Sequence, residues 1–344
     1  MPADAHALSR SANAVIAELD DRIDRTIAPL LDGAPVALVD FPDHANVGDS
    51  AIWMGERAFF DRHGAAIAYC SSLKTHAAED LKAHLPGGTV FLHGGGNFGT
   101  IWKAHQDLRI DTLARLRDHA IVQLPQSLFF DDDAAVTETA RAIEAHGRFT
   151  LCVRDVPSFE FAQRHFQCEI LLCPDMAIAI GPLPRKQPRV DVFGLLRTDR
   201  ERSLSVGALG TGDRIETGDW LDESRNAMRL TSAGSRLLTI GSDAAAARLT
   251  KYDRLAKARI NRGIGMLSSG RVVITDRLHG HIMSTLLDIP HVALDNSYRK
   301  IGNFIDCWTH DVDIVRTATT IDAALQQADG LLAELSAKAE RALR

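Results

Sequence analysis

The chain has 344 residues, of which 45% are hydrophobic and 24% are charged, and it carries a formal net charge of −6 at pH 7. The composition is ordinary for a soluble globular enzyme, and the length is comfortable for two domains. A negative charge without any basic tract argues against nucleic acid as the main partner. No apolar run approaches the roughly 20 residues that a membrane-spanning helix needs.

The cysteines and the first residues indicate the cellular location. The five cysteines lie mostly within or beside apolar runs and lack the spacing of metal ligands, which predicts buried, reduced thiols. The opening residues, MPADAHALSR, contain no apolar segment of the kind found in secretory signals. We therefore expect a cytoplasmic protein without a transmembrane segment. Any peripheral membrane association would come through a lipid-linked substrate or a partner.

The first half of the chain alternates between predicted strands and helices. Apolar residues at helical spacing predict a helix within residues 6–31, ended by Gly33, and a second helix over residues 50–63. Short apolar runs typical of buried strands lie at residues 36–39, 67–70, 89–92, 120–124, 149–153 and 170–173. Repeated β-α alternation with apolar strands predicts a parallel sheet that is covered on both faces.

The segment Gly181–Pro188 carries three prolines and is the best linker candidate. Beyond it, apolar runs predict strands at 190–196, 237–240, 272–274 and 291–294, and helical patterns cover residues 244–267, 281–287 and 321–343. Residues 198–235 are polar and rich in glycine, so we expect loops there with a short helix around residues 220–230. The predicted domains are residues 1–182 and 189–320, followed by a terminal helix over 321–344.

A turn after the strand Val272–Ile274 places an arginine and a histidine two residues apart, as Arg277-Leu278-His279. Open α/β sheets bind ligands beyond the carboxyl ends of their strands, where helix N-termini present N–H groups. Arg277 and His279 therefore suit a small, multiply charged anion, although each could instead be structural. Arg154 and Arg197 also end predicted strands, and for each of them a surface or salt-bridging role is the simpler interpretation.

The loop Gly94–Gly99 fits the G-x-G-x-x-G pattern directly after a predicted strand. A dinucleotide site is disfavoured because the loop does not follow the first strand, and because the next strand ends without an acidic residue for a ribose. The preceding His93 completes a likeness to the oxyanion loop of lipases, but the chain has no G-x-S-x-G elbow. A tight turn and a close backbone approach to a ligand remain as interpretations.

Two further polar stretches precede predicted helices. The stretch Asn46-Val47-Gly48-Asp49 could form a local turn and helix start, or it could contact a substrate. The triplet Asp131–Asp133 resembles a D-x-D metal site, but its place before a helix favours a role in complementing the helix dipole. No other metal-ligand spacing appears in the sequence, so we expect no metal.

Taken together, Arg277-Leu278-His279, the downstream Lys300, the stretch Asn46–Asp49 and the loop Gly94–Asn97 resemble the polysaccharide pyruvyl transferase family. The order and spacing of these motifs carry the resemblance, which covers residues 36–308. Members of that family transfer a pyruvyl group from phosphoenolpyruvate to a sugar as a ketal. The resemblance implies an α/β fold with two Rossmann-like domains in a GT-B-like arrangement and an interdomain cleft. By the same analogy, the terminal helix could pack back on the N-terminal domain.

The resemblance also implies roles for single residues. Phosphoenolpyruvate carries a phosphate and a carboxylate, which forked guanidinium groups match. The expected donor-binding residues are Arg277, Arg154, Arg197, Leu278 and Lys300. His279 is the expected acid, and Asp49 is expected to position or deprotonate a sugar hydroxyl. Asn46, Gly48, Gly95, Gly96 and Asn97 are expected to face the cleft and the acceptor. No cofactor is expected besides the donor substrate.

The expected acceptor is a sugar or lipid-linked oligosaccharide of an exopolysaccharide or cell-wall glycan precursor, and two alternative functions stay open. A GT-B glycosyltransferase would share the fold and cleft but would need a base-stacking pocket and a carboxylate for the ribose of a nucleotide sugar. A non-catalytic regulator of polysaccharide assembly would bind the same ligands without releasing phosphate.

Overall fold

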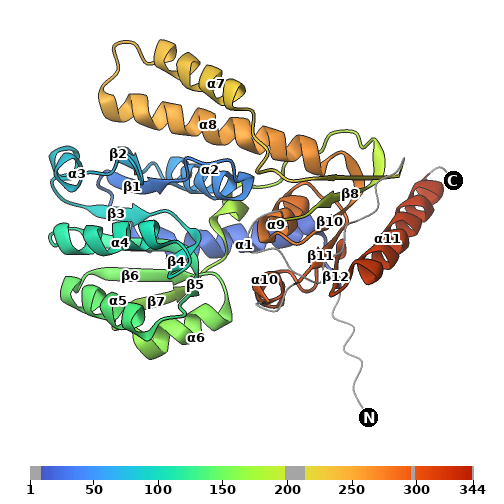
Figure 1. The fold of residues 1–344 in the computed structure, drawn as a ribbon, viewed down its shortest axis with the longest axis horizontal. Helices are drawn as coiled ribbons and strands as arrows, with labels where there is room; N and C mark the ends of the chain where they lie inside the picture. Colours follow the sequence, from blue (N-terminus) through green and yellow to red (C-terminus); the bar gives the residue numbers. More distant parts are fainter. Residues whose placement is uncertain (1–8, 198–213, 296–298, 343–344) are drawn as a thin grey trace. The chain divides into compact units, whose positions relative to one another are not determined.

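The computed structural model describes residues 9–197, 214–295 and 299–342, so that much of the predicted polar stretch 198–235 lies outside it. The chain forms two compact units, each with its own parallel β-sheet (Figure 1). Unit 1 comprises residues 1–19, 181–222 and 260–344, and unit 2 comprises residues 20–180 and 223–259. Both units are therefore built from separate stretches of chain, whereas the sequence predicted continuous domains.

The sheet of unit 2 has seven parallel strands, in the order β2-β1-β3-β5-β6-β7 with β4 paired to β5. The strands are β1 (Val36–Phe41), β2 (Ile67–Ser72), β3 (Thr89–Leu92), β4 (Gly95–Gly99), β5 (Ala120–Phe129), β6 (Phe149–Val153) and β7 (Glu169–Leu172). The helices are α2 (Val47–Arg62), α3 (Ala78–His84), α4 (Lys103–Arg115), α5 (Asp133–His146) and α6 (Val156–His165), with η2 (Met176–Ile180) after β7. The chain goes from β1 to β2 and then returns to β3 on the other side of β1, so the strand order reverses between β1 and β3.

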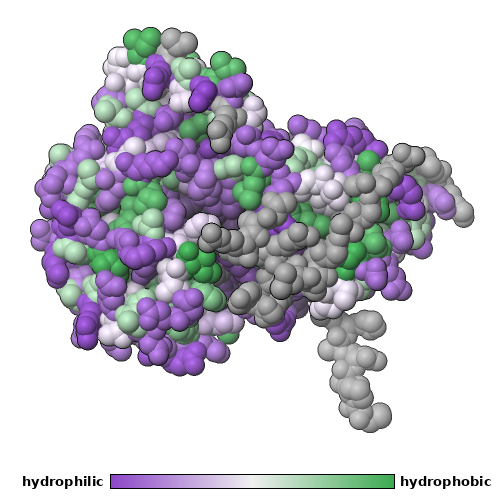
Figure 2. All heavy atoms as spheres, viewed as in Figure 1, coloured by the Kyte–Doolittle hydropathy of each residue, from purple (hydrophilic) through white to green (hydrophobic). Residues whose placement is uncertain are grey.

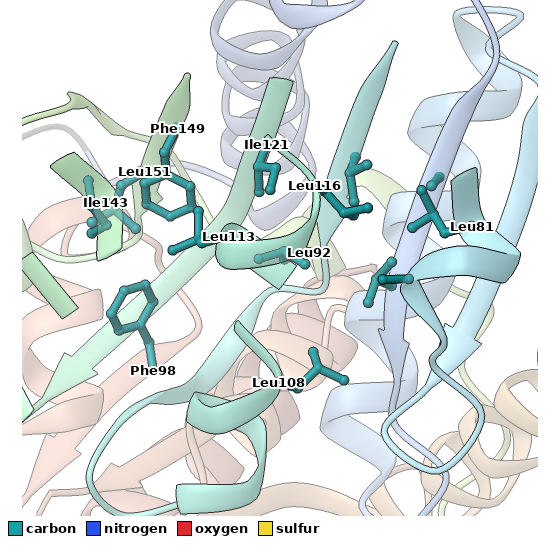
Figure 3. Close-up of a cluster of buried hydrophobic side chains, with 14 of the residues drawn as sticks. Leu81, Leu92, Phe98, Leu108, Leu113, Leu116, Ile121, Ile143, Phe149 and Leu151 are labelled. Carbon is teal, nitrogen blue, oxygen red and sulfur yellow. The ribbon is translucent and has the colours of Figure 1, made fainter. Parts of the chain in front are cut away.

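Apolar side chains from the sheet and its helices form the core of unit 2. Strand β1 is buried along its whole length, as expected for a central parallel strand. Figure 3 shows a cluster in which Leu92, Ile121 and Leu151 of the sheet pack with Leu113 of α4 and Ile143 of α5. Fully burying one such side chain contributes about 1.5–3 kcal/mol. The predicted sheet with two covered faces is confirmed for this unit.

Two long helices complete unit 2. The helix α7 (Arg225–Leu238) lies beside α8 (Ala244–Leu267), and residues of α8 before 260 belong to this unit (Figure 1). Tyr252 of α8 stacks on Phe41 with the ring centroids 4.1 Å apart, and its hydroxyl lies 2.9 Å from Thr75 Oγ1. Asp253 Oδ1 accepts a hydrogen bond of 2.8 Å from Trp53 Nε1. These contacts attach α8 to the β1 and β2 side of the sheet.

The sheet of unit 1 has five parallel strands in the order β12-β11-β10-β8-β9. The strands are β8 (Val190–Leu195), β9 (Ile215–Gly218), β10 (Gly270–Thr275), β11 (His291–Leu294) and β12 (Val315–Ala318). The helices are α9 (Leu278–Leu286), α10 (Lys300–Trp308) and α11 (Ile321–Ala342), and α1 (Ala12–Ile27), with η1 (Ala28–Leu30) after it, begins in this unit and ends in unit 2. Here the strand order reverses between β8 and β10.

The terminal helix α11 packs on the sheet of its own unit. Ala324, Ala328 and Leu331 share one buried cluster with Val272 of β10 and Val292 of β11. The structure therefore differs from the sequence-based expectation that this helix could pack back on the N-terminal domain. None of the helices in the described ranges is long and apolar enough to span a membrane.

Most predicted strands and helices form close to their predicted bounds, with one error and several omissions. The strand predicted at residues 237–240 is wrong, because α7 continues to Leu238 and a turn follows. Such a short apolar run does not distinguish a strand from the end of a helix. The elements β4, β9, β12 and α10 were not predicted. The sequences of β9 (IETG) and β12 (VRTA) are too short and polar for a strand signal.

Candidate active site

Each sheet places polar side chains where its strand order reverses. Open α/β sheets bind ligands at such switch points, because the neighbouring crossover connections leave the sheet on opposite faces. In unit 2 the switch point lies at the carboxyl ends of β1 and β3, next to Asp40 and His93. In unit 1 it lies at the carboxyl ends of β8 and β10, next to Arg197 and Arg277. Most of the residues predicted for the site lie in one of these two clusters.

Asp40 of β1 has an unusual backbone and a buried carboxylate. Its φ of 78° is a conformation that residues other than glycine rarely adopt, and the residue is 3% exposed. Its Oδ2 lies 2.7 Å from His105 Nδ1 and accepts a hydrogen bond of 3.3 Å from Asn97 Nδ2. Strained backbone that surrounding contacts hold in place is concentrated at functional sites. Asp40 and His105 were not predicted, although an acidic residue directly after an apolar strand was a usable signal.

Besides Asp40, two further side chains from other elements hold Asn97. Its Oδ1 accepts hydrogen bonds from Arg109 Nη2 at 3.0 Å and from Gln126 Nε2 at 2.8 Å, and its backbone N–H donates to Gln126 Oε1. Arg109 is 2% exposed, and burial lowers the pKa of its guanidinium to about 10. The guanidinium lies 4.1 Å from the centroid of the Phe98 ring. The orientation of Asn97, a predicted cleft residue, is thus fixed by its neighbours.

Glu56 and His93 form a buried pair beside the glycine loop. Glu56 Oε2 lies 2.8 Å from His93 Nδ1, and Glu56 Oε1 accepts a hydrogen bond of 2.9 Å from the Gly94 N–H. Burial alone would lower the pKa of His93, but the nearby Glu56 carboxylate outweighs it, and the pKa is raised. His93 thus carries positive charge beside the loop over a wider pH range than an ordinary histidine. Glu56 was not predicted, although its place among apolar residues in the sequence of α2 was a usable sign of a buried acidic residue.

The two predicted motifs of unit 2 meet at Asp49 and Gly95. Asn46 is the N-cap of α2: its Oδ1 accepts from the Gly48 N–H at 3.1 Å, and its Nδ2 donates to Asp49 Oδ2 at 2.8 Å. This arrangement confirms the helix-start interpretation. A Cβ placed on Gly95, whose φ is 122°, would lie 3.7 Å from Asp49 Oδ1, so the two loops are in contact. The predicted residues Asn46, Gly48, Asp49, Gly95, Gly96 and Asn97 are therefore brought together.

In the stretch Gly94–Gly99, close packing requires glycine at one position or more. A Cβ on Gly94 would lie 2.9 Å from the carbonyl oxygen of Pro125, which is too close for a real side chain. The positive φ of Gly95 also favours glycine. The stretch is therefore not the tight turn that was one of its interpretations: residues 95–99 form strand β4, and close packing and a positive φ account for Gly94 and Gly95.

Arg154 lies inside unit 2, at the end of β6. It is 1% exposed, its Nη1 donates to Asp175 Oδ2 at 2.5 Å, and its Nε donates to Ser127 Oγ at 2.9 Å. Ser127 Oγ in turn donates to Asp155 Oδ2 at 2.6 Å, and Asp155 is the N-cap of α6. Arg154 is therefore a salt-bridging residue, as the simpler interpretation of its sequence context held, and it is buried rather than at the surface.

Arg277 is the N-cap residue of α9, directly after β10. Its backbone N–H donates to Thr275 Oγ1 at 3.1 Å, and its Nη2 lies 2.8 Å from both carboxylate oxygens of Asp219, just beyond β9. Its guanidinium carbon lies 5.8 Å from the centroid of the Trp220 ring, within the range of a cation–π contact. Asp219 and Trp220 were not predicted, because their stretch of sequence has no clear periodicity.

Leu278 and His279 follow in the first turn of α9, and they are 6% and 8% exposed. A Cβ on the next residue, Gly280, would lie 2.2 Å from Thr275 Oγ1, so only glycine lets the helix start this close to the strand. The imidazole of His279 is thereby held at the N-terminal end of α9, where backbone N–H groups favour anions.

Arg197 and Lys300 lie at the same edge of the sheet. The Arg197 N–H donates to Asp276 Oδ1 at 2.8 Å, which joins the ends of β8 and β10, and burial raises the pKa of the Asp276 carboxyl. Lys300 is the half-buried first residue of α10, which follows the neighbouring strand β11. Unit 1 thus gathers three predicted cations, Arg197, Arg277 and Lys300, beyond the carboxyl ends of adjacent strands.

His281 is a buried structural residue. Its Nδ1 lies 2.7 Å from His291 Nε2, and its Nε2 lies 3.0 Å from Thr309 Oγ1. Burial keeps the pKa of His281 well below its ordinary value and lowers that of His291 to about 4. Both imidazoles are therefore neutral at physiological pH.

The described residues contain no cluster of side chains that could bind a metal ion. Groups of three or more histidine, cysteine or acidic side chains placed to hold an ion are absent from residues 9–197, 214–295 and 299–342. Asp132 is the N-cap of α5 and accepts a hydrogen bond of 2.9 Å from the Ala134 N–H. The acidic triplet is therefore a helix start, as its sequence context favoured. Burial raises the pKa of Cys70 and Cys152 to about 12, so these thiols stay protonated.

Comparisons with known proteins show what the chain is similar to. The family model described as Polysaccharide pyruvyl transferase matches residues 46–298. Pyruvyl transferase 1 of Schizosaccharomyces pombe is 32% identical over 301 residues, which cover 84% of this chain and 73% of that protein. The Bacillus subtilis protein named "Putative pyruvyl transferase EpsO" is 30% identical over 300 residues, covering 84% of this chain and 91% of that protein. A crystal structure of a functionally uncharacterized Klebsiella pneumoniae protein has a TM-score of 0.53 at 16% identity and covers 88% of this chain and 99% of that one, which supports the fold alone.

Proposed function

Because the chain belongs to the polysaccharide pyruvyl transferase family, we propose that it transfers a pyruvyl group from phosphoenolpyruvate to a sugar of an exopolysaccharide or cell-wall glycan precursor. Pyruvyl transfer is what the family description and the names of the relatives state. The donor and the class of glycan are what the proposal adds.

One observation carries the choice of donor: Arg277 and His279 lie at the start of α9, at the switch point of unit 1. A guanidinium and the N–H groups of a helix N-terminus both favour anions, and phosphoenolpyruvate has two anionic groups. Lys300 and Arg197 at the same sheet edge supply further positive charge. We assign donor binding to Arg277, Leu278, Lys300 and Arg197.

Arg154 is part of the proposed donor site on the strength of the resemblance. Its guanidinium already contacts Asp175 and Ser127, which fixes its orientation. A guanidinium held in this way loses little side-chain entropy when it binds a further anion.

The proposed chemistry starts with His279 as the general acid. It gives a proton to the methylene carbon of phosphoenolpyruvate, which becomes a methyl group and leaves an oxocarbenium-like centre at the adjacent carbon. One sugar hydroxyl adds to this centre, the bond to the phosphate oxygen breaks, and a second hydroxyl closes the ketal. Of the two hydroxyl protons, one restores the acid and one leaves with the phosphate. Only phosphate and the ketal are formed, so no oxidant or reductant is needed.

The acceptor is assigned to the cluster of unit 2. Asp49 accepts a hydrogen bond from Asn46, and we propose that it positions or deprotonates a sugar hydroxyl. Asn97 offers a side-chain amide whose orientation three hydrogen-bond partners fix. Gly48, Gly95 and Gly96 let the backbone come close to the sugar. A sugar presents many hydroxyl groups, which suits this dense set of amides and carboxylates.

Further parts of the proposal concern the setting of the reaction. We propose that the two units adopt a GT-B-like arrangement with a cleft for both substrates, that the protein works in the cytoplasm, and that no cofactor or metal is required besides the donor. A lipid-linked oligosaccharide is a suitable acceptor.

Ligand binding and product analysis test the donor. A ligand that binds only the folded protein at 100 times its dissociation constant stabilises it by about 2.7 kcal/mol, so phosphoenolpyruvate should raise the melting temperature. Incubation with phosphoenolpyruvate and an acceptor glycan should release phosphate and yield a pyruvate ketal, seen by mass spectrometry and NMR. A melting shift with nucleotide sugars and none with phosphoenolpyruvate would overturn the proposed donor. Binding without phosphate release across a panel of acceptors would point to a regulator.

A further inference from the structure

The helix α7 of unit 2 and the turn after it expose several large apolar side chains. Leu230, Leu238 and Ile240 are 74%, 66% and 79% exposed, whereas the next most exposed large apolar residue in the described part of the chain, Trp102, is 51% exposed. Ser235 of the same helix is 1% exposed and Thr231 is half-buried. The helix thus buries a serine while Leu230 and Leu238 are exposed, which departs from the usual amphipathic pattern with apolar residues toward the protein.

The buried side of α7 is stable because its hydroxyl groups bond within the helix. Thr231 Oγ1 donates to the Ala227 carbonyl at 3.0 Å, and Ser235 Oγ donates to the Thr231 carbonyl at 2.9 Å. The side chain of Arg254 in α8 also reaches this helix, since its Nη2 would lie 3.4 Å from a Cβ on Gly234. Ser235 can therefore be buried with its hydroxyl satisfied, while Leu230 and Leu238 stay exposed.

Positive charge accompanies the exposed apolar side chains. We call Ala227, Leu230, Ala233 and Leu238, together with Ile240 in the turn after the helix, the outer face of α7; all five are exposed. Arg229 and Arg236 are exposed too, and their spacing of seven residues puts them on one flank of this face. Residues 225–241 contain three arginines and no acidic residue, although the whole chain has a net charge of −6. Figure 2 shows hydrophobic and hydrophilic residues side by side over α7.

We propose that the outer face of α7 binds the surface of a membrane that contains anionic lipids. Leucine and isoleucine side chains can enter the boundary between headgroups and acyl chains, while arginines extend to lipid phosphates. A stable protein partner fits less well. A helix of 14 residues is about 21 Å long and about 10 Å wide, so its outer face covers roughly 200 Å², far below the roughly 800 Å² per partner of a standard interface. The proposal does not depend on the donor or acceptor assigned above.

Vesicle flotation with the full chain tests the proposal. The protein is mixed with vesicles of phosphatidylcholine alone, or of phosphatidylcholine with phosphatidylglycerol, and the fraction that floats is measured. We expect flotation with the anionic vesicles, much less with the neutral ones, and a decrease at high salt. Since each arginine near an anionic surface contributes about 1 kcal/mol, Arg229→Gln with Arg236→Gln should weaken partitioning about tenfold or more.

A second double variant, Leu230→Ser with Ile240→Ser, removes apolar contact and should also abolish flotation. Two control variants match the kinds of change made. Arg115→Gln removes an exposed arginine of α4, and Val156→Ser removes an apolar side chain that is 43% exposed on α6; both should float like the wild type. Circular dichroism and thermal melting establish that each variant is folded.

Three outcomes would overturn the proposal. The wild type could fail to float with anionic vesicles, or the α7 variants could float as well as it does. Sedimentation could instead show that the wild type self-associates, that Leu230→Ser with Ile240→Ser abolishes this, and that vesicles are not bound. In that case the outer face of α7 is an interface between copies of the chain.

Discussion

Arg277 Nη2 lies 2.8 Å from both carboxylate oxygens of Asp219, and the two side chains are 4% and 9% exposed. The pair joins the segment after β9 to the start of α9, across the carboxyl end of the sheet of unit 1. A buried arginine without a partner would be costly, so the carboxylate both permits the burial of Arg277 and fixes the direction of its guanidinium. The proposed donor site is therefore oriented before any donor binds.

Replacing Arg277 by lysine should not be conservative. Lysine keeps the charge but loses the planar fork, so the affinity for phosphoenolpyruvate should fall by about 1.5–3 kcal/mol, the typical contribution of a hydrogen bond to a charged group. Isothermal titration calorimetry measures the change. Arg214→Lys is the matched control, since Arg214 pairs with Asp191 on the exposed side of the same unit. Unchanged donor affinity in Arg277→Lys would make Arg277 a structural residue.

Removing Asp219 should destabilise the protein. In Asp219→Ala the guanidinium of Arg277 stays buried without its carboxylate, and loss of one partner of a buried pair typically costs about 3–5 kcal/mol. Asp191→Ala breaks exposed pairs with Arg214 and Arg271, for which at most about 1 kcal/mol is expected. Urea unfolding of both variants provides the comparison. Equal losses of stability would mean that Asp219 does not support Arg277 in this way.

The sequence predicts the site residues that are neighbours in the chain, and it misses those that only the fold brings together. Arg277, Leu278 and His279 are consecutive and follow an apolar strand, so the strand, the turn and the helix start were all visible together. Asp40 and His105 come from different elements and meet only in the folded unit, so no spacing in the chain announces the pair. Asp219 lies in a polar stretch without periodicity, and nothing there links it to Arg277.

The secondary structure was likewise predicted where the sequence pattern is strong and missed where it is weak. The buried strands β1 and β10 are continuous apolar runs and were predicted, but the short strand β9 was not. For α7, the sequence predicted a short helix around residues 220–230 and a strand at 237–240, and it did not indicate which side of the helix faces the protein. That choice depends on the hydroxyl groups of Thr231 and Ser235, which bond within the helix and so can be buried.

Acid should destabilise the protein through His281 and His291. The pKa of each is lowered by burial, that of His291 to about 4, so the unfolded chain binds more protons than the folded one below the ordinary histidine value. Stability should therefore fall as the pH decreases from about 6.5 toward about 4. Urea midpoints across this range measure the slope.

A variant separates this effect from general acid denaturation. His291→Gln should be less stable than the wild type at neutral pH, because the bonded pair is broken, but its stability should fall less steeply with decreasing pH. His165→Gln, at an exposed position in α6, should keep the slope of the wild type. Parallel slopes for the wild type and His291→Gln would rule out the buried pair as the cause.

The acidic triplet should affect stability and not catalysis. Asp132→Ala removes the N-cap of α5, which typically costs about 0.5–2 kcal/mol. Pyruvyl transfer by this variant should be unchanged below its melting temperature, and the wild type should keep its activity after exhaustive chelation. Activity that requires an added divalent ion and is lost in Asp131→Ala or Asp133→Ala would show that the triplet binds a metal.

His279 should be required for the chemical step more than for binding. It follows Arg277 by two residues and is held in the first turn of α9 by the close packing of Gly280 on Thr275. General acid catalysis by one group typically contributes 10²- to 10⁴-fold, so His279→Gln should lower kcat by about that factor and leave phosphoenolpyruvate affinity nearly unchanged. In D₂O the wild-type reaction should place deuterium in the methyl group of the ketal, which NMR detects. His281→Gln is an informative comparison, because the ring of that buried histidine is hydrogen-bonded to His291 and Thr309, and its loss should reduce stability instead. Normal turnover in His279→Gln, or weaker donor binding without a slower chemical step, would assign the proton to another group.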